Sequence, residues 1–311
     1  MKHTIRNLVC LLLCTATLST VCTSCNSTKI SAKNLMDGVS PASVSISEPP
    51  QEEFPAQMAD FSLSLLRQIG KTSPEENRLL SPVSIEMALS LTANGAKDET
   101  LRQMEEVLGG KLNILNLSMN CYREALSSQQ PKVLLANSLW MKDENFSPNH
   151  NFLQTAADYY RPDVFSSPFD DSTVEDINHW VSDKTDGLIP NALDEISTDA
   201  VLYLINTLLF DGKWAEPYRE DQITDETFHK EDGEEAPIQL MYSEESRYLE
   251  HVLATGFLKP YEGEICFWST ASPGGHGTGR TTGTAGRKYL SGNPAKRFHC
   301  TGDSGCAQVF L

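Results

Sequence analysis

Apolar and small residues occupy nearly every position between residues 83 and 93, where Glu86 is the single charge. A helix without a polar face is buried on all sides, so this stretch predicts a helix inside a large domain. Ser81 and Pro82, directly before it, are typical of a helix start, as N-cap and first helical residue. A second helix is predicted over residues 98–108, which begin with two acids and end before a Gly-Gly pair.

Two other stretches have too few polar positions to alternate, over residues 133–141 and 199–210. Such runs are typical of strands buried on both faces, and the second predicts a strand in the middle of a sheet. Asn206 is the only amide inside that second run. A buried amide without a partner costs about 1–3 kcal/mol, so we expect Asn206 to be hydrogen-bonded.

Apolar residues recur at helical spacing in three further stretches, over residues 51–70, over residues 147–160 and after Ser172. Ser172 and Glu175 have the spacing of a capping box, which predicts that the third of these helices begins at Ser172. With 311 residues the chain can bury a sizeable core, in one large domain or in two.

The residue strings in these elements are more specific than their spacing. Residues 81–110 contain Ser-Pro-x-Ser-Ile, then Gly-Ala-Lys, then Thr, then Val-Leu-Gly. Residues 177–189 contain Ile-Asn-x-Trp-Val and then Thr-x-Gly-x-Ile, and residues 210–214 read Phe-x-Gly-x-Trp. In this order the strings resemble the serpins, the serine-protease-inhibitor family, and the resemblance covers residues 51–264.

The resemblance implies an α+β fold with a large central β-sheet, a second β-barrel-like set of strands and surrounding helices, incomplete at the C-terminus. It implies an inhibitor and not an enzyme. A target serine or cysteine protease cleaves an exposed reactive loop, which inserts into the central sheet while still acylated to the protease. No reactive-centre loop can be recognised here, so we expect the sequence as given to be inactive. A non-inhibitory serpin-like binding protein is the alternative, and a monomer without a cofactor is expected in either case.

The resemblance also implies roles for individual residues. Serpins have a polar cluster, the shutter, that tunes how readily the sheet opens, and the matching residues are Ser81, Ser84 and Asn206. Trp214 matches a tryptophan of the breach, the region at the end of the central strand that opens first. A single satisfied core amide at Asn206 is the plainer alternative.

The N-terminal residues predict export. Lys2 and Arg6 precede an apolar run over residues 8–18. That run is too short to span a membrane as a helix and is typical of a secretory signal, which we assign to residues 1–24.

Cys25 resembles a bacterial lipoprotein cleavage site, where the cysteine becomes acylated and anchors the protein in a membrane. Cys22 departs from this pattern, because leucine is usual at its position. The sequence therefore predicts an outer-membrane or cell-surface lipoprotein, with a periplasmic or secreted protein as the alternative. Residues 25–50, rich in Ser, Lys, Asn and Pro, predict a flexible tether.

The net charge, the cysteines and the histidines argue against several other classes of protein. The formal net charge of −17 argues against a nucleic-acid partner, because no basic patch can form. Of the eight cysteines, half belong to the signal region, so no disulfide framework is implied. The histidines have no metal-ligand spacing, which predicts no metal site.

The amino-acid composition of the chain changes after Glu264. Residues 265–311 hold 9 of the 19 glycines and no amphipathic run, which is typical of a non-serpin tail. A one-nucleotide frameshift near Glu264 is favoured over a genuine tail, because the shifted frame permits a further serpin-like strand. Ser304 lies in a Gly-Asp-Ser-Gly string like that of trypsin-like proteases, but no histidine motif precedes it, so a catalytic residue is not predicted.

Overall fold

The computed structural model describes residues 30–42, 44, 54–72, 79–128, 132–144, 147–197, 199–229, 233–251, 254–263 and 265–271. The helices are α2 (Phe54–Thr72), α3 (Pro82–Ala93), α4 (Asp98–Leu108), α5 (Leu112–Ser128), α6 (His150–Tyr159), α7 (Asp171–Lys184) and the short η1 (Glu220–Gln222). The strands are β1 (Lys33–Asn34), β2 (Lys132–Lys142), β3 (Asp163–Ser167), β4 (Leu202–Asp211), β5 (Ile223–His229), β6 (Glu235–Met241), β7 (Arg247–His251), β8 (Ala254–Pro260) and β9 (Cys266–Ala271).

The main sheet has the strand order β1-β3-β2-β4. Strands β2 and β4 are antiparallel over ten residue pairs, from Lys132 opposite Asp211 to Met141 opposite Leu202. Strand β3 runs parallel to β2, and the short β1 pairs antiparallel with β3. The sheet therefore joins chain segments that lie more than one hundred residues apart.

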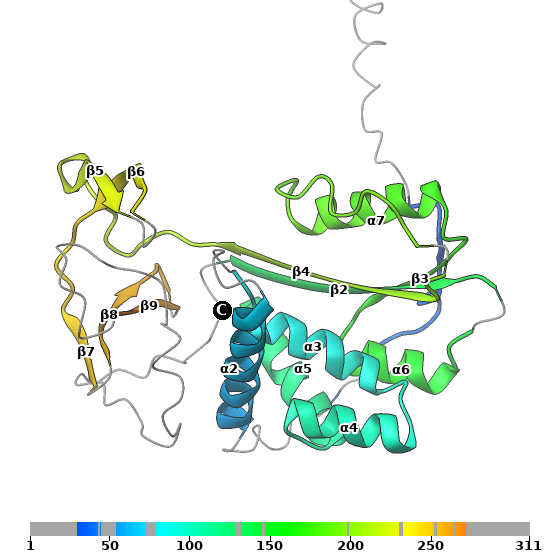
Figure 1. The fold of residues 1–311 in the computed structure, drawn as a ribbon. Helices are drawn as coiled ribbons and strands as arrows, with labels where there is room; N and C mark the ends of the chain where they lie inside the picture. The colour runs from blue at the N-terminus through cyan, green and yellow to red at the C-terminus, as the bar shows by residue number, and fades with distance from the viewer. Residues whose placement is uncertain are drawn as a thin grey trace, which may run out of the picture.

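Helices cover both faces of this sheet (Figure 1). Helices α2 to α6 lie against one face, where the larger hydrophobic core includes residues of α2, α3, α5, β2 and β4. Helix α7 lies across the other face, over a smaller core that contains Trp140, Phe165 and Trp180. The molecule is thus layered as helices, sheet and one helix.

Helix α3 confirms the prediction of a buried helix, since nine of its twelve residues are buried, Glu86 among them. Ser81 is the N-cap and Pro82 the first helical residue, as the sequence predicted. The capping box predicts Ser172 as the N-cap of α7, which is wrong by two residues. Asp170 is the N-cap there, and its carboxylate accepts a hydrogen bond from the Ser172 backbone amide at 3.0 Å.

Strand β4 differs from the predicted strand buried in the middle of a sheet. Among the described strands it lies at the edge, with β2 as its neighbour. Thr207 and Leu209 are buried, and most of its other residues are half-buried. The apolar sequence predicts that both faces of the strand are covered. It does not predict which strands pair with its edges, because those strands come from distant parts of the chain.

Two predicted segment boundaries also need correction. Residues 30–42 were predicted to be part of a flexible tether, whereas they lie against the fold and contain β1. Residues 266–271 were predicted to belong to a non-serpin tail that begins at residue 265, whereas they form β9, which pairs with β8. The rest of the predicted tail, residues 272–311, lies outside the described residues, as does the predicted signal over residues 1–24.

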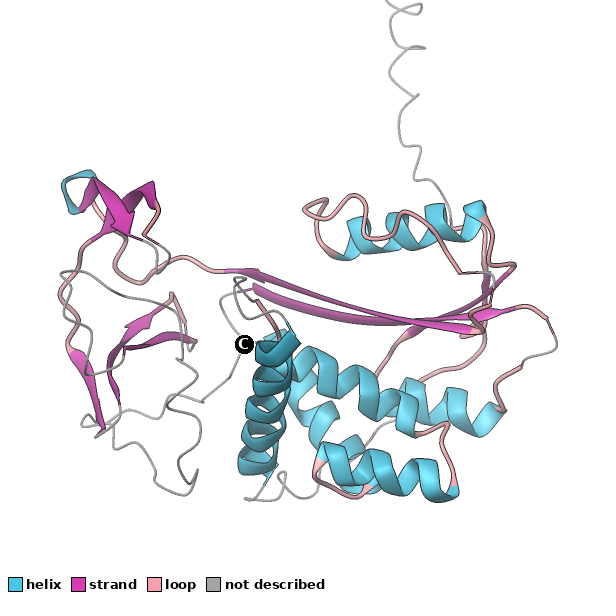
Figure 2. Cartoon of the chain, viewed as in Figure 1, coloured by secondary structure: helices cyan, strands magenta, loops and turns pink. Residues whose placement is uncertain are grey.

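The remaining strands form two small sets at one end of the main sheet (Figure 2). Strands β5 and β6 make a two-stranded antiparallel pair, and β7, β8 and β9 make a three-stranded antiparallel sheet. The residues between β4 and β5 connect these sets to the main sheet.

Candidate functional site: a polar contact beneath strand β4

A small polar contact lies between α3 and the centre of the main sheet. The Ser84 hydroxyl donates a hydrogen bond to Oδ1 of Asn206, and Nδ2 of Asn206 donates to Oδ1 of Asn137 at 2.7 Å. Asn137 and Asn206 are directly opposite each other on β2 and β4. Ser84 is 4% exposed and Asn137 is 3% exposed, while Asn206 between them is half-buried. The contact therefore joins one helix and two strands through three side chains.

The local sequence explains why these three side chains meet. Leu204, Asn206 and Leu208 alternate along β4, and the two leucines pack on the larger core, so Asn206 points toward the same helical layer. Helix α3 enters that layer at its N-terminus, where the Ser81 side chain accepts a hydrogen bond from the Ser84 backbone amide at 3.4 Å. Ser81 thus fixes the start of α3, and Ser84 makes the contact with the sheet.

Glu86 lies two residues beyond this contact in an apolar environment. It is fully buried, and neither carboxylate oxygen has a hydrogen-bond partner among the described residues. Burial raises the pKa of Glu86 to about 8, so the carboxyl is mostly protonated at neutral pH. Burial raises the pKa values of Tyr122 and Tyr160, and the charged form of the Glu86 carboxyl adds to both shifts.

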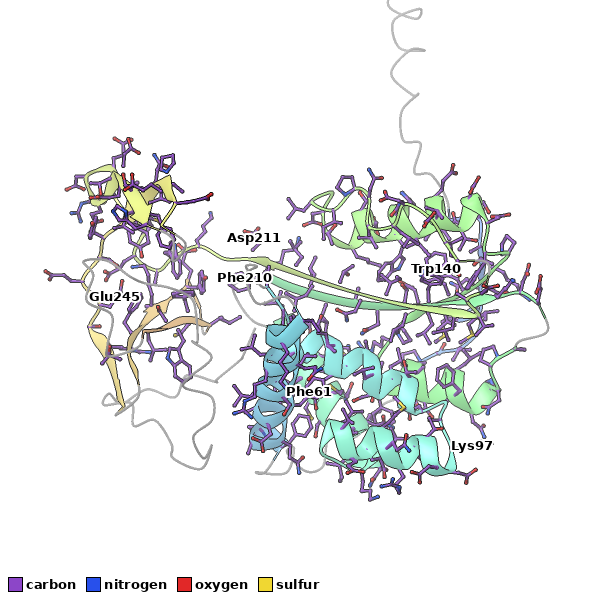
Figure 3. All side chains as sticks on the ribbon, in the orientation of Figure 1. Phe61, Lys97, Trp140, Phe210, Asp211 and Glu245 are labelled. Carbon is purple, nitrogen blue, oxygen red and sulfur yellow. The ribbon has the colours of Figure 1, made fainter. Side chains whose placement is uncertain are left out.

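Trp214 lies beyond the far end of β4, in a different cluster. Its backbone forms an isolated antiparallel bridge with Tyr261, and the two rings are stacked with their centroids 4.2 Å apart. Tyr261 also contacts Phe210, the penultimate residue of β4 and labelled in Figure 3, at a centroid distance of 4.9 Å. This aromatic cluster connects the end of the main sheet to strand β8.

A buried ion pair completes the cluster at Trp214. The Lys259 ammonium donates to Oε1 of Glu245 at 2.6 Å, and the two side chains are 4% and 13% exposed. The same ammonium lies 4.5 Å from the ring centroid of Tyr218 and 5.6 Å from that of Trp214. An ammonium ion over aromatic faces is attracted by their quadrupoles, so the rings and the carboxylate stabilise the buried charge together.

The structure brings Ser84 and Asn206 together and places Trp214 apart from them. Among the described residues, the Ser81 side chain contacts the Ser84 amide rather than Asn206.

Asn137 was missed, although an amide inside a second apolar run was a usable signal. Nothing in the sequence pairs Lys259 with Glu245, because strand pairing is needed to bring them together. Cys25 and Ser304 lie outside the described residues.

The arrangement supports a mechanical role better than a catalytic one. Ser84 donates to an amide, which is no base, so its hydroxyl is not activated as a nucleophile. In the described part of the chain, no group of three or more His, Cys, Asp or Glu side chains could hold a metal ion. The described helices are all too short or too polar to cross a membrane. What the site can do is hold α3, β2 and β4 in register until its hydrogen bonds break.

Comparison with known proteins gives one consistent match. A family model described as "Serpin (serine protease inhibitor)" matches residues 56–268. Mouse Serpin A12 is 29% identical over 217 residues, which cover 66% of this chain and 52% of that protein. Rabbit corticosteroid-binding globulin is 26% identical over 208 residues, which cover 64% of this chain and 54% of that protein. The chain therefore spans about half the length of the curated relatives it matches.

A solved structure agrees with the fold. The crystal structure of a thermophilic serpin, tengpin, in its native state has a TM-score of 0.73 and 39% sequence identity. The match covers 78% of this chain and 62% of that one. The layered arrangement of helices and sheet described above is thus shared with a solved serpin structure.

Proposed function

The chain belongs to the serpin family, and from that premise we propose that the protein acts as a serine-type endopeptidase inhibitor. In this mechanism the protease nucleophile forms an acyl bond with the carbonyl carbon of a bait residue, and the peptide nitrogen beyond it leaves as an amine. The freed loop then becomes a new strand of the main sheet. The sequence as given stays predicted to be inactive, because no reactive loop can be recognised in it.

The contact between Ser84 and Asn206 is the observation that carries this proposal. Asn206 lies on β4, and among the described strands β4 has a partner on one edge, β2. A strand added beside β4 moves it relative to α3, so the hydrogen bond between Ser84 and Asn206 must adjust. We assign Ser84 and Asn206 the role of a shutter that sets the resistance to this movement, with Ser81 supporting the helix start.

Trp214 is assigned to the breach at the end of the same strand. Its ring packs on Tyr261, which in turn packs on Phe210 of β4. If the sheet opens from this end, the aromatic stack must therefore separate before the polar contact at Asn206 breaks. The buried charge of Lys259 adds to the resistance of the same cluster.

Export through a signal over residues 1–24 and acylation at Cys25 complete the proposal. The target would then be an extracellular or cell-surface serine or cysteine protease. Labelling of growing cells with a radioactive fatty acid tests this part: incorporation that is lost in Cys25→Ser supports the anchor. Export with no incorporation refutes the anchor and leaves a periplasmic or secreted protein.

The inhibitor proposal is tested by assaying a covalent complex with a panel of trypsin-like, chymotrypsin-like and papain-like proteases. Two products are compared: the chain as given, and the product of the gene resequenced across codons 263–266. We expect a complex that survives denaturing electrophoresis with at least one active protease, from the resequenced product alone. A protease with a blocked nucleophile is the control. Cleavage of the resequenced product without any stable complex refutes inhibition.

A non-inhibitory binding protein is the second candidate function. It is supported by the relative corticosteroid-binding globulin, whose name states that it binds a corticosteroid. If this candidate is right, a steroid raises the melting temperature of the protein while no protease forms a covalent complex. Complex formation without any steroid effect rejects it.

A further inference from the structure

The N-terminal residues 30–42, which we call the strap, run across the end of the main sheet and contact three separate elements. In Figure 1 this segment is the blue chain beside β3, reaching up to α7. The strap pairs with β3 through β1, with Lys33 opposite Ser166 and Asn34 opposite Phe165. It therefore adds a strand to the edge of the sheet opposite β4.

The strap is fastened to α7 through one carboxylate. The Ser31 backbone amide donates to both oxygens of Asp176, at 2.9 and 3.1 Å. The Ser31 hydroxyl and the Ala32 backbone amide each donate to Oδ2 of Asp176 at 2.8 Å. Asp176 is 7% exposed, and a buried carboxylate needs such donors to offset its desolvation. The strap supplies all the hydrogen bonds recorded for this carboxylate in the described part of the chain.

Other contacts fix the strap beyond α7. Ile30 and Ala32 pack on the smaller core beneath α7, while Leu35 and Met36 pack on the larger core on the opposite face of the sheet. At its far end the Ala42 backbone amide donates to Asp158 of α6 at 2.7 Å. The strap thus links both cores, and its attachment to α6 is independent of its attachment to α7.

The strap and α7 also share apolar contacts beside a hollow. Ile30 and Ala32 pack on the core that includes Trp180 of α7. The hollow of about 720 Å³ next to them has Lys33 on the strap and His179 on α7 in its lining. The hydrogen bonds to Asp176 add a polar connection to this apolar contact. Departure of the strap removes these hydrogen bonds together with the contacts of Ile30 and Ala32 with the core beneath α7, so α7 is destabilised on the sheet whenever the strap leaves.

We propose that the strap is a clamp that holds α7 on the sheet, with Asp176 as its fastening point, so that release of the strap lets α7 move. Helix α7 covers the face of β2 and β4 that carries Trp140, labelled in Figure 3 between helix and sheet. The clamp thereby controls access to that face of the sheet. This inference concerns the fold alone and does not rest on inhibition of a protease.

Hydrogen–deuterium exchange of the full chain tests the clamp. Asp176→Asn keeps the size of the side chain but presents an amide group to three donors of the strap. We expect exchange of the backbone amides of Ile177, Trp180 and Val181 to rise at least about tenfold, together with those of the strap. Ser31→Ala removes one of the four bonds, so a smaller rise at the same amides is expected.

Two matched controls separate the clamp from a general loss of stability. Glu175→Gln removes the same charge from the neighbouring exposed residue of α7 and should leave exchange within about twofold of the unchanged protein. Asp158→Asn should loosen the strap near Ala42 without affecting α7. A synthetic peptide of residues 30–42 added to Asp176→Asn should not restore protection, whereas added to a chain lacking residues 1–42 it should.

The proposal is overturned if exchange in Asp176→Asn rises in the strap while α7 keeps its protection, because the strap is then a cover for the edge of β3 and no more. It is also overturned if Glu175→Gln loosens α7 as much as Asp176→Asn does. Neither result bears on whether the protein inhibits a protease, so failure of the clamp and failure of the proposed function can be told apart.

Discussion

The buried carboxyl of Glu86 makes the stability of this domain fall as the pH rises. The pKa of Glu86 is about 8 in the folded protein, against 4.5 for an ordinary glutamate, because burial disfavours the charged form. Between these two pH values the folded state binds a proton that the unfolded state has lost. The stabilising effect is therefore complete below about pH 4.5 and is lost as the pH rises toward 8.

The magnitude follows from the width of this interval. At 1.36 kcal/mol for each pH unit, the free energy of unfolding decreases by about 5 kcal/mol between pH 4.5 and pH 8. That loss is comparable to the whole stability of a small domain, which is about 5–15 kcal/mol. The substitution Glu86→Gln keeps the shape and removes the titration, so its unfolding free energy should lack this contribution.

The assay is urea unfolding of the unchanged protein and of Glu86→Gln at a series of pH values from 4.5 to 8.5. Other carboxylates titrate in both proteins, so the difference between the two curves isolates Glu86. We expect that difference to shift by about 5 kcal/mol in favour of Glu86→Gln as the pH rises. Glu175→Gln, on an exposed position of α7, is the control and should run parallel to the unchanged protein. Parallel curves for Glu86→Gln would refute the reasoning, because Glu86 would then be charged in the fold.

Two further predictions concern the polar contact at the middle of β4 and the ion pair in the cluster beyond its end. Ser84→Ala and Asn206→Ala should each lower the free energy of unfolding by about 1–3 kcal/mol, and the double variant should cost about 1 kcal/mol less than their sum. Additive effects in urea unfolding would show that the two side chains are not coupled. Lys259→Met leaves the Glu245 carboxylate buried without its cation and should cost about 3–5 kcal/mol, most of which a second change, Glu245→Leu, should restore. If Lys259→Met and the unchanged protein have equal stability in urea unfolding, Lys259 and Glu245 do not form a buried pair of charges.

The sequence predicted best those features that depend on residues close together in the chain. Helix α3 was predicted from its lack of a polar face, and its start from Ser81 and Pro82, since both signals lie within a few residues of each other. The hydrogen bonding of Asn206 was predicted from the cost of an unpaired amide, and the structure confirms it with two partners. The switching role assigned to Ser84 and Asn206 stays a prediction.

Features that depend on distant partners were not predicted. Residues 30–42 have the composition of a tether, and nothing near them in the sequence reveals that Asp176, more than 140 residues away, accepts their hydrogen bonds. Lys259 and Glu245 are charged residues that a sequence pattern assigns to the surface. Their burial follows from the aromatic rings of Trp214 and Tyr218, which other parts of the chain bring together.

The position at which the strap joins the fold has a consequence for orientation at a membrane. Five residue steps separate Cys25 from Ile30, which span at most about 18 Å when fully extended. An acyl group on Cys25 would therefore hold the end of the molecule with β1 and α7 close to the lipid surface. Strands β5 to β9 lie at the opposite end of the main sheet in Figure 1, so they would face away from the bilayer, toward whatever approaches from outside.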